Sequence, residues 1–181
     1  MTLENAARQW VIDKYPYNSL HLIRTLDWLL RIAPDSKDTT RMAALTHDME
    51  RAFPGPDQPI WDGNVNYEYD VAHSNRSARI VGAWLREQRG EEGYVTEVEE
   101  LIKVHEFGGW PEADFVQAAD SLSFLDVNID LFLGFVTSGR YTRQQVRAKF
   151  DYSLTRIRIP SVQELARPLL ETANARLAAL P

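Results

Sequence analysis

The chain has 181 residues, 44% of them hydrophobic and 25% charged, so it can fold around a full hydrophobic core as one domain, 1–181. It carries 20 Lys and Arg against 26 Asp and Glu, and this acidic balance argues against a stable complex with nucleic acid. The absence of cysteine excludes disulfides, thiolate metal sites and cysteine nucleophiles. Because neither a signal peptide nor an apolar run of membrane-spanning length is present, the sequence predicts a cytoplasmic protein without a membrane partner.

Nearly every stretch of the chain has the periodicity of an amphipathic helix, with apolar residues three or four positions apart. The expected helices, in chain order, span 3–14, 18–33, 36–52, 69–89, 96–107, 111–125, 128–137, 142–154 and 161–180. The segment FPGPDQPIWDG, residues 53–63, holds three prolines and two glycines and is expected to be a long loop. No segment alternates apolar and polar residues for the length of a strand, so the predicted fold is all-α, a single-domain bundle of about eight to nine helices.

Charge is distributed unevenly along the chain. Residues 140–181 hold eight basic and three acidic side chains. This basic segment either packs against the acidic remainder, forms a dimer contact, or contributes to binding an anionic substrate. The last expected helix carries apolar residues at helical spacing, which can cover the chain's own core or pair with a second subunit, so a homodimer stays open.

The chain has four histidines, and each lies on a different expected helix. They are His21, His47, His73 and His105. His105 continues an apolar stripe at helical spacing, so its imidazole is expected to point into the core. Asp120 lies between apolar neighbours on its own helix face, where an isolated buried carboxylate is costly. Any one of these residues alone is more simply a hydrogen-bonded core residue, but together they predict a divalent-metal site, which needs imidazole and carboxylate ligands.

The order of these residues resembles the HD-domain superfamily of metal-dependent phosphohydrolases. That family has a first His on one helix, a His-Asp doublet on the next, and a distant Asp. Here the pattern falls on His21, then His47 and Asp48, then Asp120. The flanking residues agree: Arg24 follows His21 as in the family's H-x-x-R, and the run AALTHD is similar to its A-A-L-L-H-D.

The resemblance covers about residues 20–125 and leaves the C-terminal helices, 126–181, outside it. It implies one divalent metal (Mn, Ni, Co, Zn, Mg or Fe) and a metal-activated water that attacks a small phosphorylated metabolite or nucleotide. The implied ligands are His21, His47, Asp48 and Asp120, with His73 and His105 as possible ligands of a second ion. One ion is favoured, because only 15 residues separate His105 from Asp120, as in the shorter mononuclear hydrolases.

Candidates for supporting catalytic roles lie close to these ligands in the sequence. They are Glu50, Arg51, Arg24, Arg76 and His105. The glutamate could orient or deprotonate the attacking water, the arginines could bind phosphate, and the histidine could contact phosphate or protonate the leaving group. Each charged residue is explained equally well as a solvated charge or a pair on a helix face. Two other functions stay open: a mixed-valent di-iron oxygenase, which needs iron at both sites, and a non-catalytic HD-like regulatory module.

Overall fold

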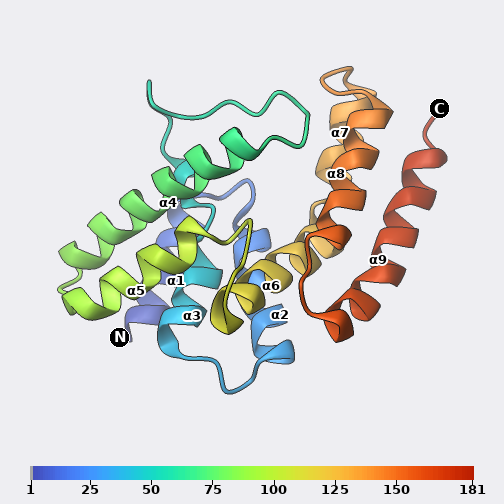
Figure 1. Ribbon diagram of the computed structural model, residues 1–181. Coiled ribbons are helices and arrows are strands. Elements are labelled where there is room, and N and C mark those ends of the chain that lie inside the picture. Colours follow the sequence, from blue (N-terminus) through green and yellow to red (C-terminus); the bar gives the residue numbers. More distant parts are fainter. Residues whose placement is uncertain (1) are drawn as a thin grey trace.

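The structure is a computed structural model that describes residues 2–181. Over these residues the chain forms nine α-helices and one 3₁₀ helix, with no strand (Figure 1). The elements are α1 (Leu3–Lys14), α2 (Ser19–Ile32), α3 (Asp38–Thr46), η1 (Met49–Ala52), α4 (Tyr67–Glu87), α5 (Glu92–Lys103), α6 (Pro111–Val127), α7 (Ile129–Thr137), α8 (Arg143–Thr155) and α9 (Pro160–Ala178). The all-α prediction is confirmed.

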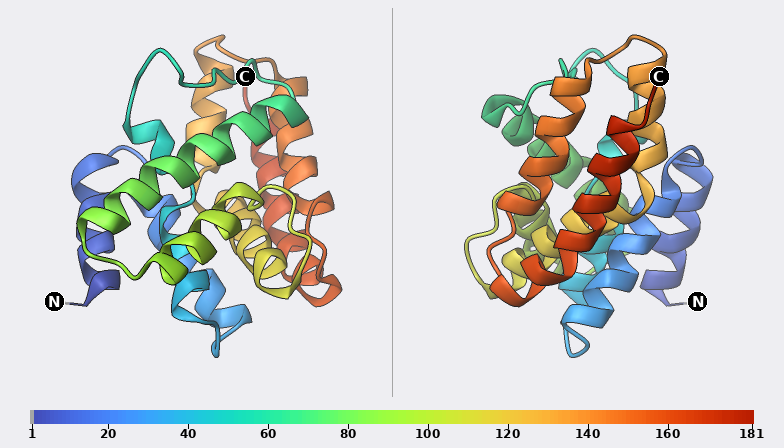
Figure 2. Two further views of the ribbon diagram at one scale, coloured as in Figure 1. Left: turned by 60° about the vertical axis from the view of Figure 1, so that its left-hand side comes forward. Right: turned by 90° about the vertical axis from the view of Figure 1, so that its right-hand side faces the viewer.

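Helix α6 lies between two groups of helices and contributes to two hydrophobic cores. One core is formed with α1–α5 and the other with α7–α9. The two groups lie on opposite sides of α6 in the view of Figure 1, and Figure 2 shows the same helices from two further directions. Ala119 packs into the first core, whereas Ala118 and Leu122 pack into the second. A helix buried on nearly all sides has little solvent-facing surface, so a polar side chain on α6 must find a partner inside the protein.

The third helix ends earlier than the sequence predicts. Instead of continuing to residue 52, α3 ends at Thr46, and a separate 3₁₀ helix follows. The His47 ring donates from Nδ1 to the carbonyl of Ala44, 3.0 Å away. In a continuous helix, this carbonyl would instead accept from the backbone N–H of Asp48. The side chain of His47 therefore caps the helix, and Asp48 leaves the helical path.

The fifth helix differs from expectation at both ends. It begins at Glu92 rather than near Thr96, and it ends at Lys103, before His105. His105 is fully buried, as predicted, but it lies in the turn after the helix. Its Nδ1 donates to the carbonyl of Ile102 at 2.7 Å, so this histidine caps α5 in the same way that the earlier one caps α3.

The long loop between η1 and α4 is attached at both ends to other parts of the chain. Arg76 of α4 donates to the carbonyl of Phe53 at 2.7 Å. The Tyr141 hydroxyl, near the start of α8, donates to the carbonyl of Trp61 at 3.0 Å. The loop therefore crosses from the first helical group to the second, as Figure 1 shows. Among residues 2–181, no helix has both the length and the apolar character needed to cross a membrane.

Candidate metal centre

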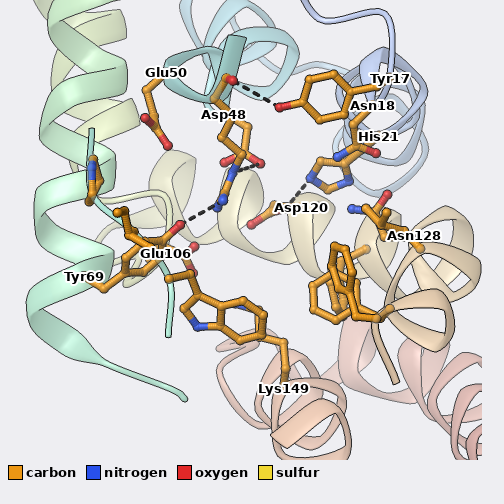
Figure 3. Close-up of a pocket in the computed structure, with 18 of the residues that line it drawn as sticks. Tyr17, Asn18, His21, Asp48, Glu50, Tyr69, Glu106, Asp120, Asn128 and Lys149 are labelled. Atoms are coloured by element: carbon orange, nitrogen blue, oxygen red, sulfur yellow. Dashed lines mark hydrogen bonds and ion pairs between the residues drawn. The ribbon is translucent and has the colours of Figure 1, made fainter. Parts of the chain in front are cut away.

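The four histidines and two of the aspartates converge at one buried place. His21 comes from α2, His47 and Asp48 from the end of α3, His73 from α4, His105 from the turn after α5, and Asp120 from α6. They form three overlapping groups of three residues, and within each group the ligand atoms lie within 4.8 Å of one another. None of the six residues is more than 8% exposed. Figure 3 shows the His21 imidazole and the Asp48 and Asp120 carboxylates turned toward this place.

Each histidine is oriented by a hydrogen bond at Nδ1. Ser123 donates its hydroxyl proton to the carbonyl of His21 at 2.7 Å, so its oxygen, 3.0 Å from His21 Nδ1, accepts from the ring. His47, His73 and His105 face acceptors only: the Ala44 carbonyl, the Glu50 carboxylate and the Ile102 carbonyl, respectively. The proton of each neutral ring is therefore at Nδ1, and each Nε2 presents a lone pair to the shared centre.

The centre has acceptor atoms facing one another without a donor between them. Among residues 2–181, the buried Nε2 atoms of His47, His73 and His105 make no hydrogen bond of normal geometry. Nε2 of His73 lies 2.9 Å from Asp48 Oδ1, and Nε2 of His21 lies 3.1 Å from Asp120 Oδ1. A cation satisfies such a set of lone pairs and carboxylates, and mixed imidazole and carboxylate ligands suit divalent transition metals. The residues present thus fit a divalent metal ion.

The two aspartates are arranged alike, with one oxygen facing the centre and the other bound by an arginine. Asp48 places Oδ2 3.0 Å from Arg51 Nε, and Asp120 pairs through Oδ2 with Arg156. Burial by itself raises the pKa of each carboxyl, but the adjacent guanidinium and the neighbouring histidines together outweigh burial and hold the pKa well below its usual range. Both aspartates are therefore ionised, and together they supply the two negative charges that balance a divalent ion.

The histidines differ in their affinity for protons. Burial lowers the pKa of His47, but the carboxylates of Asp120 and Asp48 outweigh burial and raise it to about 8. Burial and the neighbouring His47 lower the pKa of His105 to about 3. His105 is consequently neutral at physiological pH, whereas a proton on His47 competes with a metal ion for the same lone pair.

Glu50 and Arg51, predicted from their closeness to the His-Asp doublet, lie beside the centre. Glu50 is 1% exposed and accepts from His73 at Oε1 and from Arg76 at Oε2, at 3.1 and 3.0 Å. Arg51 donates to Asp48 and, at 2.8 Å, to the hydroxyl of Tyr69. Both residues line the cavity above the centre, but both carboxylate oxygens of Glu50 are already engaged.

The other two predicted arginines lie elsewhere. Arg24 is held by Asp126, with 3.3 Å between Nε and Oδ2, and its side chain is 42% exposed. Arg76 is buried against Glu50 and the start of the long loop. Neither guanidinium lines the cavity: Asp126 holds that of Arg24 away from it, and that of Arg76 lies behind Glu50.

Several residues at the centre come from parts of the sequence not predicted to form it. Arg156, between α8 and α9, is buried and pairs with both Asp120 and Glu106. Burial raises the pKa of Glu106, but the Arg156 guanidinium, Lys149 and His105 together outweigh burial and hold the pKa at about 2. Lys149 of α8 lines the same cavity and has no ion-pair partner in the described part of the chain. The basic character of residues 140–181 was the available signal for Lys149 and Arg156, and the position of Glu106 beside His105 was the signal for the glutamate.

The candidate metal centre opens into a cavity of about 350 Å³. His21, Asp48 and Asp120 lie at its base, and Arg51, Lys149 and Arg156 line its sides. Figure 3 shows Lys149 across the cavity from Asp48 and His21. The arrangement combines a buried set of metal ligands with cationic side chains and room for a small molecule.

Comparison with known proteins identifies one family. Neither the curated proteins nor the solved structures include a match to this chain. The family model described as "HD domain" matches residues 19–125, the part of the chain that supplies all six residues of the metal centre. HD domains are generally metal-dependent hydrolases, and the buried His and Asp groups agree with that chemistry. Because the match spans more than half of the chain, the protein belongs to the HD domain family.

Proposed function

We propose that the protein is a divalent-metal-dependent phosphohydrolase that acts on a small phosphorylated metabolite or nucleotide. The proposal rests on one observation: the His and Asp cluster lies at the base of a cavity that Arg51, Lys149 and Arg156 also line. A phosphate monoester carries two negative charges near neutral pH, and these cations complement them. The cavity volume of about 350 Å³ is at the lower end for small-molecule sites, which favours a single small substrate over a polymer.

In the proposed reaction, different residues of the chain hold the metal ion and the phosphate group. A divalent ion bound by the His and Asp cluster would lower the pKa of a coordinated water and polarise a phosphoryl oxygen. Arg51 and Lys149 would bind the non-reacting phosphoryl oxygens and stabilise the charge of the transition state. The Tyr69 hydroxyl accepts from Arg51, so its own proton is free to donate to the substrate. The oxygen of water bonds to phosphorus, the bond from phosphorus to the ester oxygen breaks, and the alcohol leaves with a proton.

Glu50 has a positioning role in this scheme. It is buried between His73 and Arg76 and binds both, so it holds the His73 ring with Nε2 toward the centre. Arg76 in turn also binds the backbone of the long loop. This chain of contacts keeps the ligand imidazole in one orientation and connects the loop to the metal centre.

One observation favours a second candidate function. Asp48, His73 and His105 form a ligand group of their own, which could hold a second ion beside the first. Two irons per chain would support the di-iron oxygenase rather than the phosphohydrolase. Elemental mass spectrometry of protein purified without chelator separates the two: about one divalent ion supports the hydrolase, and two irons with O₂ consumption support the oxygenase.

The direct test is phosphate release by Mn²⁺-loaded protein from a panel of small phosphate esters. The Asp48→Ala variant is expected to lose bound metal and turnover together, because it removes a ligand shared by two of the groups. Asp27→Ala is the matched control, since that carboxylate is 50% exposed and pairs only loosely with Arg24, 3.8 Å away. If Asp48→Ala keeps its metal and its turnover, the proposed site is wrong.

A further inference from the structure

The side chains that line the cavity change from charged to mainly apolar with distance from the metal centre. Its base is charged, whereas another wall is mainly apolar and aromatic and includes Ile60, Trp61, Phe124, Phe132 and Phe135. Two cations adjoin these rings: Arg140 lies 4.8 Å from the centroid of Phe135, and Lys149 lies 5.8 Å from that of Phe124. The Trp61 ring packs against Phe132, with 5.7 Å between centroids, and Phe132 packs against Phe124 at 4.8 Å. These residues belong to the long loop and to α6 and α7, so the anchored loop and the second helical group build this wall together.

A buried amide with no partner lies in the same cavity. Asn128, at the junction of α6 and α7, is 6% exposed and lines the cavity. Its backbone N–H bonds to Phe124, but within residues 2–181 its side chain makes no hydrogen bond. Figure 3 shows it beside His21. The amide atoms of Asn128 are not enclosed by protein, so the group faces the cavity and is available to a ligand.

We infer that this outer part of the cavity is a subsite for the leaving group of the substrate, and this inference rests on the proposed function. The subsite accepts an apolar, ring-sized body that packs against the Trp61, Phe132 and Phe135 wall. It also binds one hydroxyl or amide group of that body through Asn128. Phosphate monoesters of ring-bearing alcohols are therefore the substrate class, in preference to phosphate esters of small polyols, which would leave the aromatic wall in contact with water.

Non-hydrolysable probes test the subsite independently of turnover. Affinities of Mn²⁺-loaded protein for methylphosphonate, phenylphosphonate and the three hydroxyphenylphosphonates are measured by titration calorimetry. Phenylphosphonate is expected to bind about tenfold or more tightly than methylphosphonate, because the ring buries apolar surface. The best hydroxyphenyl isomer is expected to gain a further factor of about 3 to 10 from the hydrogen bond to Asn128.

Two variants separate the parts of the subsite. Asn128→Ala should remove the gain from the hydroxyl and keep the preference for phenyl over methyl, whereas Phe135→Ala should reduce the phenyl preference severalfold. Neither should change the affinity for methylphosphonate, which occupies only the phosphate side. Asn75→Ala is the control, because Asn75 is exposed on α4.

The outcomes distinguish this inference from the proposed reaction. Equal affinities of the wild-type protein for methyl- and phenylphosphonate, or no binding of either, would overturn the subsite. Phosphate release from simple esters by the same preparation would then still support the hydrolase. If the ring preference is present and depends on Phe135 and Asn128, but no phosphate ester is hydrolysed, the subsite holds and the proposed reaction fails.

Discussion

Arg156 offers the sharpest test of how the C-terminal helices support the metal centre. Its side chain is 5% exposed and pairs with Glu106 and Asp120, whose side chains are 6% and 7% exposed. It also donates from Nε to the hydroxyl of Ser121 at 2.8 Å. The substitution Arg156→Met keeps much of the side-chain volume but leaves two buried carboxylates without their cation.

The expected cost is large because the two carboxylates that remain are mostly buried and lose the cation that neutralises them. Removing one partner of a buried ion pair lowers the free energy of unfolding by about 3–5 kcal/mol. For a chain of this size, this loss lowers the thermal unfolding midpoint by roughly 6–20 °C. The cost depends on pH with a defined sign. In the wild type, the low pKa of Glu106, about 2, contributes stability that is present above the unfolded value and is lost as pH falls toward 2. Without Arg156 the folded carboxyls retain a proton more readily, so the deficit is greatest near pH 7 and decreases below about pH 4.

Urea unfolding of metal-free protein in chelator, at pH 7 and pH 4, measures this deficit without masking by a bound ion. Arg158→Met is the matched control, two residues away, because Arg158 is 55% exposed and pairs with Asp114 only at 3.9 Å. Its change in unfolding free energy should stay within about 0.5 kcal/mol. If Arg156→Met costs no more than Arg158→Met at pH 7, the buried pair does not support the centre as described.

Other predictions concern the ion, the phosphate and the core. Mn²⁺ should raise the unfolding midpoint of the wild type, with about 2.7 kcal/mol of added stability at a hundredfold excess over Kd. Calorimetric scans of His47→Ala should show no such increase, and elemental analysis should find metal and activity lost together. Arg51→Ala should raise KM for a phosphate ester about tenfold or more and change metal content little; loss of the metal instead would make Arg51 a support for the ligands. Leu26→Ala, at a position that is 0% exposed, should cost about 2–5 kcal/mol in urea unfolding, and a cost below 1 kcal/mol would contradict its place in the core.

Local sequence patterns predicted the fold class and most of the helices. Apolar residues at helical spacing mark a buried face wherever a helix is amphipathic, and prolines and glycines mark its ends. The same reasoning placed His105 and Asp120 in buried positions, because each lies among apolar residues at helical spacing, and both are buried. The predicted C-terminal ends of α3 and α5 were wrong, because the imidazole groups of His47 and His105 donate to the carbonyls of Ala44 and Ile102. Helix periodicity contains no information about a side chain that competes with the backbone in this way.

Only the tertiary structure decided which charged residues belong to the centre. Arg24 follows the first histidine within a turn yet is held by Asp126 outside the cavity, whereas Arg156 lies 36 residues from Asp120 and pairs with it. In sequence, a buried arginine that neutralises carboxylates looks the same as one that faces water. The packing of α8 and α9 against α6 makes the difference, because it removes water from Arg156 and brings Glu106 and Asp120 within its reach.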